Sequence, residues 1–403
     1  MKKIGILGGG QLGRMTIEEA RKLLCYIEVL SPEFPAPAAD LADETVLGAL
    51  MDYDAVLELS ERVDVLSYEI EHVNVDALRA AETAGKPVLP PAEVLALIQD
   101  KAAQKQVLDS TAIPTAPWAL VDAAADSSLA LETAIAALGG LPLVQKSRRG
   151  GYDGRGVVVL RDRADLTTPE MGGRLLSGPS FLEKKIAFTK ELAVMVAIDG
   201  KGGSASWPCV EMVFDERVNM CDSVLMPARE PVETLKKAEQ IARQAVQAIL
   251  DAAGKISSEA GRTVKLAGVF AVELFLSADG DILVNEIAPR PHNSGHLTIE
   301  ACITSQFNQY YRILAGYPLG ATDQVLPAMM INLLGEPNAD GEPEYVGLET
   351  ALAVPGVAVH LYGKRTVKPF RKMGHLTALG STIEEAIQRA EQARQAIRVQ
   401  AKA

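Results

Sequence analysis

Short apolar runs alternate with helically spaced apolar residues over the first hundred positions of the chain. Residues 3–7, 26–30 and 63–68 are compact apolar runs that predict buried strands, and residues 15–24 have helical spacing. Strands separated by helices and short loops are typical of a parallel sheet, whose ligand site lies at the carboxyl ends of the strands. We therefore predict an N-terminal α/β substrate-binding domain over residues 1–98.

The rest of the chain mixes helical and strand patterns in a different order. A helical pattern over residues 93–108 precedes Pro114 and Pro117, which predict an extended connector and a domain boundary. Beyond it we predict a small flap domain over residues 112–186 and a larger C-terminal domain over 187–403 that ends in a sheet subdomain. The clearest helical pattern covers residues 232–253, and we expect Gly254 to terminate it.

A β-hairpin is predicted where two alternating patterns, residues 267–276 and 281–287, flank an Ala-Asp-Gly turn. Glu273 and Glu286 interrupt the apolar pattern on opposite arms, at positions that make them approximate cross-strand neighbours. With the amide oxygen of Asn285 they form an oxygen-only ligand set, which suits Mg²⁺ bridging nucleotide phosphates. The alternative is an acid pair on a solvent-exposed face, which the apolar flanking residues disfavour.

Composition and charge exclude several classes of protein. The 403 residues include 40 Lys plus Arg and 52 Asp plus Glu, a formal net charge of −12 that lacks the basic footprint of a nucleic-acid binder. The four cysteines contain no C-x-x-C pair, which argues against a cysteine-based zinc site and suits a reducing cytosol. No apolar stretch approaches the roughly 20 residues needed to span a bilayer. We expect a soluble, cytoplasmic protein.

A glycine-rich loop, Gly8-x-Gly10-x-x-Gly13, follows the first predicted strand and opens a helix. Small residues let backbone N–H groups and a helix N-terminus approach a phosphate, as in the dinucleotide fingerprint. A nicotinamide site also requires an acid at the end of the second strand, and Ser31 occupies that place. We interpret the loop as a site for another phosphorylated or polar ligand, with a purely structural turn as the alternative.

A second glycine-rich segment, residues 146–156, connects strands predicted at 143–146 and 157–160. Its sequence, Lys-Ser-Arg-Arg-Gly-Gly-Tyr-Asp-Gly-Arg-Gly, combines glycines with basic side chains in an otherwise acidic chain. Flexible amides together with Arg and Lys suit a polyphosphate that is covered and released. The alternative is a solvated hairpin loop, and no Walker-type Gly-x4-Gly-Lys-Ser/Thr motif occurs.

Two later segments are polar. Residues 290–296, Arg-Pro-His-Asn-Ser-Gly-His, follow Glu286 closely and predict a substrate loop beside the carboxylates. Zinc binding by His292 and His296 is the alternative, but the intervening Asn-Ser-Gly disfavours a helix that would align them. A late basic cluster consists of Lys364, Arg371, Lys372 and His375. Taken by itself, it is more typical of a solvated charged face than of a binding site.

Together these motifs resemble the ATP-grasp fold, and within it the N5-carboxyaminoimidazole ribonucleotide synthetases of purine biosynthesis. The resemblance rests on residues 9–15 (Gly-Gly-Gln-Leu-Gly-Arg-Met), 68–73 (Tyr-Glu-Ile-Glu-His-Val), 151–156 (Gly-Tyr-Asp-Gly-Arg-Gly), 285–296 (Asn-Glu-Ile-Ala-Pro-Arg-Pro-His-Asn-Ser-Gly-His) and 371–375 (Arg-Lys-Met-Gly-His). It implies an α/β and α+β fold, with nucleotide held between two α+β units behind a biotin-carboxylase-like parallel-sheet domain.

The resemblance also implies a reaction. ATP, bicarbonate and 5-aminoimidazole ribonucleotide would give N5-carboxyaminoimidazole ribonucleotide, ADP and phosphate by way of carboxyphosphate. Lys101 and Lys146 would hold the ATP phosphates, and Glu273 and Glu286 would carry Mg²⁺, or Mn²⁺ in its place. The remaining ATP-binding positions come from the flap, the adenine pocket, the ribose site and the hairpin: Gly151, Tyr152, Gly154, Gly156, Glu183, Lys184, Lys185, Ile186, Glu191, Glu211, Asn285 and Glu286.

On the substrate side, Asp153 is the candidate base that takes a proton from the attacking amine. Arg155 and Arg290 are the other catalytic candidates. Glu69 or Glu71 would hold the ribose, and the resemblance does not choose between them. The other implied substrate-binding residues are Gln11, Leu12, Arg155, His292, Asn293, Lys364 and Arg371.

Three alternatives stay open at this stage. Another ATP-grasp ligase acting on an amine nucleotide should lack the Tyr-Asp pair and the His-Asn-Ser-Gly-His stretch. A nicotinamide-dependent dehydrogenase is opposed by Ser31. A non-catalytic nucleotide-binding protein should lose at least one of Lys146, Asp153, Glu273 and Glu286, and the sequence has all four. We expect small-molecule substrates and a homodimer, with neither nucleic acid nor membrane as a partner.

Overall fold

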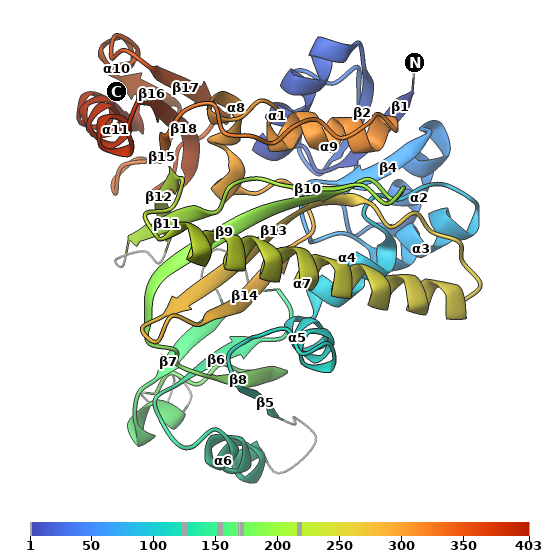
Figure 1. Ribbon diagram of the computed structural model, residues 1–403. Coiled ribbons are helices and arrows are strands. Elements are labelled where there is room, and N and C mark those ends of the chain that lie inside the picture. The colour runs from blue at the N-terminus through green and yellow to red at the C-terminus, as the bar shows by residue number, and fades with distance from the viewer. Residues whose placement is uncertain are drawn as a thin grey trace.

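The computed structural model of the chain describes residues 2–121, 127–150, 156–167, 169, 173–215 and 220–402. Figure 1 shows the N-terminal and C-terminal regions at the top of the view and a small sheet with α6 at the bottom. A long sheet and the helix α7 lie between them. The residues predicted to hold the ATP phosphates and the metal lie where the small sheet approaches the long one.

The N-terminal region contains the predicted parallel sheet, with strand order β3-β2-β1-β4. Its strands are β1 Lys3–Leu7, β2 Tyr26–Ser31, β3 Glu44–Leu47 and β4 Val65–Tyr68. Its helices are α1 Gln11–Ala20, continued by a 3-10 turn over Arg21–Leu23, α2 Tyr53–Arg62 and α3 Val75–Thr83. The strand β3 was not predicted, because both its ends are exposed at the sheet edge and it lacks a buried apolar run.

The single helix predicted over residues 93–108 is wrong, because the segment forms two helices. They are α4 Ala92–Gln99 and α5 Lys101–Ser110. Asp100 between them has an extended backbone, and its carboxylate accepts hydrogen bonds from the N–H groups of Ala102 and Ala103. An aspartate in this position is a strong N-cap, so it begins a new helix although the apolar spacing continues. The break gives α5 its own direction towards the small sheet.

The small sheet is antiparallel, with strand order β5-β8-β6-β7, and α6 Ser127–Ala137 packs on it. Its strands are β5 Trp118–Val121, β6 Leu143–Ser147, β7 Val157–Leu160 and β8 Ser180–Lys184, with a 3-10 turn over Arg163–Leu166. The predicted pairing of the strands that flank the flap segment is confirmed, since β6 and β7 pair from Leu143↔Leu160 to Lys146↔Val157.

The long sheet has strand order β14-β13-β9-β11-β12-β15-β18-β17, with β10 added beside β9. The predicted hairpin is confirmed as β13 and β14, and Gly280 in its turn has a positive φ of 84°. The strand bounds are β9 Phe188–Ile198, β10 Ser204–Ser206, β11 Val210–Asp215, β12 Met220–Met226, β13 Gly268–Ser277, β14 Ile282–Ala288, β15 Ala328–Leu334, β17 Val357–Leu361 and β18 Lys372–Leu379.

The helix α7 Val232–Glu259 covers one face of the long sheet and does not stop at Gly254. A Cβ at Gly254 would lie 3.0 Å from the side chain of Leu266, so this glycine allows close packing within the helix. The helix ends at Glu259, and Gly261, directly after the C-cap Ala260, has a φ of 72°, the left-handed conformation that favours glycine and terminates helices. The predicted terminator was therefore wrong by seven residues, from 254 to 261.

The other face of the long sheet packs against the N-terminal region and two short helices, α8 Thr298–Ala301 and α9 Gln306–Ala315, which follow a 3-10 turn over Asn293–Gly295. The last helices, α10 Leu348–Leu352 and α11 Ile383–Ala396, pack in a separate core on β15 and β18, on the face that also carries α7. The strands β16 Pro343–Val346 and β19 Arg398–Ala401 pair with each other. Residues of β1 and β2 share one apolar core with β9, β13 and α9. Among the described helices, none is both long and apolar enough to cross a membrane.

Candidate active site

The two hairpin glutamates lie directly opposite each other, as predicted, with Glu273 on β13 paired to Glu286 on β14. The amide of Asn285 donates to a carboxylate oxygen of Glu273 at 3.2 Å. Burial, and then repulsion from Glu286, raise the pKa of Glu273 to about 7. Burial would raise the pKa of Glu286 too, but the ammonium of Lys101 outweighs it and holds that pKa below its usual value.

These three oxygen donors fit a divalent cation that completes its shell with phosphate oxygens. Mg²⁺ is usually bound through one or two carboxylates plus substrate phosphates, and not by a cage made of protein alone. Consistent with this, the described part of the chain has no group of three or more His, Cys, Asp or Glu side chains placed to hold a metal ion. The donor set therefore suits Mg²⁺ or Mn²⁺ arriving with a nucleotide.

Three lysines converge on the hairpin from α5 and the small sheet. Lys146 on β6 donates to the amide oxygen of Asn285 at 2.9 Å and lies 2.6 Å from a carboxylate oxygen of Glu183 on β8. Lys101, the first residue of α5, forms an ion pair with Glu286. One helical turn later, Lys105 forms an ion pair with the other oxygen of Glu183. These three lysines form a cationic cluster, which supplies the local positive charge that an acidic chain needs to bind a polyphosphate.

The helix α5 forms hydrogen bonds to both the hairpin and the small sheet. The amide of Gln104 bonds both the N–H and the C=O of Ile287 on β14, at 3.1 and 3.4 Å. Towards the small sheet, Asp100 binds the guanidinium of Arg148 with both carboxylate oxygens, at 3.0 and 2.5 Å. The N–H of Lys101 also donates to the carbonyl of Arg148 at 2.9 Å. The start of the flap segment is thereby anchored to the helix that carries two of the lysines.

The predicted adenine and ribose residues occupy different surroundings. Glu183 is buried, whereas Lys184 and Lys185 are exposed and Ile186 is half-buried. Glu191 on β9 lies on the same sheet face as Glu273, because its neighbour Ala193 pairs with Glu273. Glu211 does not join this group, since it pairs with Leu192 on the opposite face, and Arg229 and Lys190 bind its carboxylate at 2.5 and 3.1 Å.

The pH dependence of stability should report Glu191. Burial, followed by repulsion from Glu273, raises the pKa of Glu191 to about 7 from an ordinary 4.5. A carboxylate with a raised folded-state pKa favours the folded state below the unfolded pKa, and that stability is lost as the pH rises through about 7. We expect Glu191→Gln to be more stable than the parent at pH 8 by about 2 kcal/mol. At pH 4, below the ordinary value of 4.5, that advantage should disappear, as chemical denaturation at the two pH values will show; a constant difference would contradict it.

The two candidate ribose glutamates, Glu69 and Glu71, have different partners in the structure. The N–H groups of Gly10 and Gly13 at the start of α1 both donate to the carboxylate of Glu69, which is 7% exposed. The carboxylate of Glu71 instead lies 2.8 Å from the guanidinium of Arg290. The carboxylate of Glu69 therefore occupies the position at the glycine loop where an external anion would bind, and Glu71 faces the substrate loop. Of the loop residues themselves, Leu12 packs in a small core with Met15, Phe307 and Tyr362, and Gln11 is half-buried.

The substrate loop lies against the carboxylates. The Nε2 atom of His292 is 3.7 Å from Glu273, and its Nδ1 atom is 2.9 Å from the hydroxyl of Ser294. Burial, reinforced by Arg290, holds the pKa of His292 well below its usual value, so the ring is neutral. Asn293 exchanges two amide hydrogen bonds with Asn332 on β15, at 2.9 and 2.8 Å. His296 turns away from His292 and contacts Gln306 at 3.2 Å.

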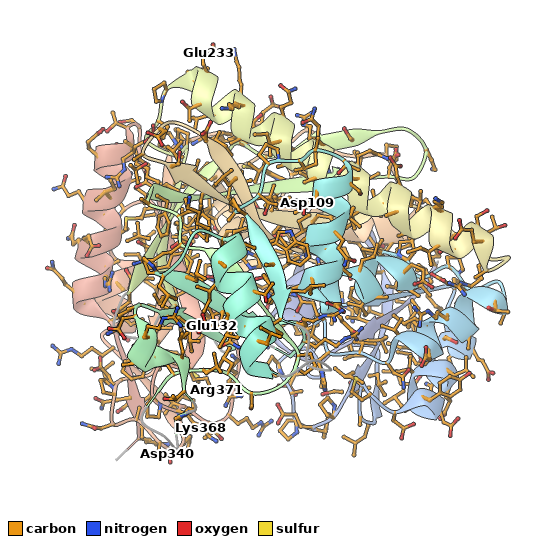
Figure 2. The ribbon with its side chains drawn as sticks, turned by 90° about the horizontal axis from the view of Figure 1, so that it is seen from below. Asp109, Glu132, Glu233, Asp340, Lys368 and Arg371 are labelled. Carbon is orange, nitrogen blue, oxygen red and sulfur yellow. The ribbon has the colours of Figure 1, made fainter. Side chains whose placement is uncertain are left out.

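The late basic cluster approaches the glycine loop through Lys364. Its ammonium donates to the carbonyl of Lys372 at 2.7 Å and lies 5.5 Å from the ring centre of Tyr362. Burial raises the pKa of Glu69, and the N–H groups of the glycine loop and the charge of Lys364 oppose this shift. Arg371 donates to the carbonyl of Thr366 at 2.8 Å, and Figure 2 shows it near the edge of the molecule with Lys368. His375, by contrast, is fully buried in a stack of aromatic rings.

The central flap residues predicted to act in catalysis and ATP binding lie outside the described residues. They are Gly151, Tyr152, Asp153, Gly154 and Arg155. Gly156 is described, and its carbonyl accepts the N–H of Ser147 at 2.8 Å, which closes the base of the flap segment. Its φ of 74° is one that favours glycine.

Sequence reasoning missed three residues that hold this site together: Lys105, Gln104 and Asn332. A signal for Lys105 was present, since it follows Lys101 at i, i+4 and so lies on the same helical face. Gln104 and Asn332 bond to the backbone of β14 and to the side chain of Asn293, contacts that no sequence spacing reveals.

Comparison with known proteins places these features in a family. Residues 1–99 match the ribonucleotide synthetase preATP-grasp domain, residues 106–307 the ATP-grasp domain, and residues 328–389 the phosphoribosylaminoimidazole carboxylase C-terminal domain. The chain is 38% identical over 379 residues to N5-carboxyaminoimidazole ribonucleotide synthase of Synechococcus elongatus, covering 94% of this chain and 89% of that protein.

Fungal relatives are longer. The chain is 40% identical over 390 residues to phosphoribosylaminoimidazole carboxylase of Ogataea methanolica, covering 95% of this chain and 67% of that protein. It spans 65% of the Candida albicans carboxylase, at 39% identity over 400 residues that cover 96% of this chain. The chain thus corresponds to about two thirds of these proteins.

Solved structures show the same fold over the whole chain. The synthetase of Thermotoga maritima superposes with a TM-score of 0.86 at 39% identity, covering 100% of both chains. The enzyme of Aspergillus clavatus, solved with ADP and 5-aminoimidazole ribonucleotide, superposes with a TM-score of 0.84 at 33% identity, covering 98% of both chains. The predicted ATP-grasp fold is thereby confirmed.

Proposed function

The chain belongs to the N5-carboxyaminoimidazole ribonucleotide synthetase family of ATP-grasp enzymes, and we propose that it carboxylates 5-aminoimidazole ribonucleotide with bicarbonate and ATP. The products are N5-carboxyaminoimidazole ribonucleotide, ADP and phosphate. One observation carries the proposal: Glu273 contacts Asn285, the hydrogen-bond partner of Lys146, at 3.2 Å and His292 of the substrate loop at 3.7 Å. A phosphate held at the first group would lie beside an amine held at the second.

In the first step, an oxygen of bicarbonate attacks the γ-phosphorus of ATP, and the bond from that phosphorus to ADP breaks. Such transfers depend on positioning and charge neutralisation more than on covalent help. Lys101 and Lys146 supply positive charge on the two sides of the hairpin. Mg²⁺ or Mn²⁺, held by Glu273, Glu286 and Asn285, would add charge neutralisation at the phosphates. The adenine and ribose would lie along residues 183–186 and Glu191.

In the second step, the amine nitrogen attacks the carboxyl carbon of carboxyphosphate, the bond from that carbon to phosphate breaks, and a base accepts the amine proton. We assign the base to Asp153 from the family resemblance. Arg290 is held by Glu71 at 2.8 Å, where its charge would face the leaving phosphate. The neutral ring of His292 can orient the substrate without adding charge. Lys364 and Arg371 would hold the 5′-phosphate.

We also propose that the enzyme works in the cytoplasm as a homodimer. Three exposed apolar side chains on the N-terminal region, Leu47, Met51 and Tyr53, support an interface there. Light scattering should then give a molar mass near twice the 43.0 kDa of the chain.

ADP release by the purified protein tests the proposed reaction. We expect release with Mg²⁺-ATP to require both bicarbonate and 5-aminoimidazole ribonucleotide, and Asp153→Asn to reduce it by about 100-fold or more. Release that ignores this nucleotide but responds to another amine would favour a different ATP-grasp ligase. If ATP binds but no ADP forms under any condition, the protein is not an enzyme of this family's reaction.

A further inference from the structure

Lys105 is the most deeply buried of the three lysines in the cationic cluster. It is 2% exposed, on α5, and its ammonium contacts the carboxylate of Glu183 and the hydroxyl of Thr115. Figure 2 marks the far end of the same helix with Asp109, whose carboxylate accepts the indole N–H of Trp118 at 2.7 Å. Lys105 is therefore fixed between the helix, the connector and the small sheet.

Glu183 is shared by two lysines, one on each oxygen. Its side chain is 4% exposed, and its second oxygen lies 2.6 Å from Lys146. Burial opposes the charge on this carboxylate, but Lys146 and then Lys105 outweigh it and lower its pKa. Glu183 and Lys146 lie on one face of the small sheet, since Glu183 pairs with Val144, two residues before Lys146. Together, the two lysines and Glu183 carry one net positive charge.

The two lysines differ in what else they can reach. Lys146 also donates to Asn285 on the hairpin, so a small rotation moves its ammonium towards a phosphate held by the carboxylates. Lys105 has no such path, because Thr115 binds it and in turn donates to the carbonyl of Val284 at 2.8 Å. When Lys146 turns to a triphosphate, the buried Glu183 loses its partner on the hairpin side and keeps Lys105 alone. Removing one partner of a buried ion pair is strongly unfavourable.

We propose that Lys105 is a positioning residue for ATP binding: it keeps Glu183 paired while Lys146 leaves Glu183 for the triphosphate. The inference rests on the proposed function, because it assumes that ATP phosphates bind at Lys146. Without Lys105, Lys146 would be the remaining ammonium on Glu183, and the nucleotide would have to break a buried pair to recruit it. With Lys105 present, Lys146 can leave Glu183 for the triphosphate, and the buried carboxylate still has a positively charged partner.

A double-mutant cycle on Lys105 and Glu183 tests this role, with the affinity for a non-hydrolysable ATP analogue as the readout. Lys105→Met should raise the Kd of the analogue by about 30-fold or more, by analogy with breaking a buried pair. In steady-state kinetics the effect on KM for ATP should exceed the effect on kcat. In the Glu183→Gln background the same Lys105→Met change should raise the Kd less than about threefold, because no buried carboxylate remains to be compensated.

Two other roles for Lys105 give different results in the cycle. If Lys105 attracts ATP only through its charge, Lys105→Met will cost the same affinity in both backgrounds. If it only stabilises the fold, the melting temperature will fall and the Kd of the analogue will not change. Either result overturns the proposal, and Lys105→Gln repeats the measurement if the Met variant does not fold. Failure of the proposed function would show separately, as absence of ADP release by the parent protein.

Discussion

Replacing Lys146 with methionine is expected to lower kcat/KM for ATP by about 10²–10³-fold, the cost of losing one preorganised positive group from a charged transition state. The Lys146 ammonium lies between Asn285 at 2.9 Å and Glu183 at 2.6 Å, within reach of phosphates held at the hairpin. The variant should stay folded, because Lys105 remains paired with Glu183 and the cluster becomes neutral. Steady-state kinetics and thermal unfolding on the same preparation measure both expectations.

The matched control for Lys146→Met is Lys236→Met. The Lys236 side chain is 67% exposed on α7, and the same substitution there should leave kcat/KM and melting temperature unchanged. If Lys146→Met lowers kcat/KM less than about tenfold, the ATP phosphates do not bind at this lysine, and the arrangement of the first step has to be revised.

The two hairpins that carry the site could be predicted from the sequence, because the alternation of apolar and polar residues marks their neighbouring strands. In the hairpin, a turn with glycine at a left-handed position fixes the register from Leu276↔Ile282 to Leu274↔Val284. A β-bulge between Glu273 and Leu274, which the alternation does not predict, then places Glu273 opposite Glu286. The flap strands β6 and β7 follow from the same reasoning. These two hairpins bring the cationic segment and the carboxylates close to each other.

What could not be predicted depends on contacts between distant segments. Apolar spacing continues through Asp100, and only its bonds to the next helix and to Arg148 show why the helix breaks there. Gly254 looks like a terminator until Leu266 is seen packed against it. Glu69 and Glu71 are indistinguishable in sequence, yet one binds the glycine loop and the other binds Arg290. Partners 56 and 59 residues away decide the role of Glu69, and Arg290, far later in the chain, decides that of Glu71.

The second large effect is expected at the hairpin, where Glu286→Gln should lower kcat/KM for Mg²⁺-ATP by on the order of 10³-fold, equivalent to several kcal/mol of lost charge stabilisation. The pKa of Glu286 is held low by Lys101 against burial, so the parent side chain is a full carboxylate at neutral pH. Its side chain is 42% exposed, and an ion pair this open contributes little to stability, so folding should be almost unaffected. Titration of activity with Mg²⁺ and with Mn²⁺ should show that the variant needs far more of either ion.

Asp281→Asn is the control for this change, since it removes a carboxylate from the exposed turn of the same hairpin. It should leave the metal dependence as in the parent, because Asp281 lies five residues from Glu286 along the chain, at the opposite end of β14. Equal metal requirements in Glu286→Gln and the parent would mean that the cation is not held by this hairpin. The paired carboxylates would then act on the substrate loop through Glu273 and His292, which are already 3.7 Å apart.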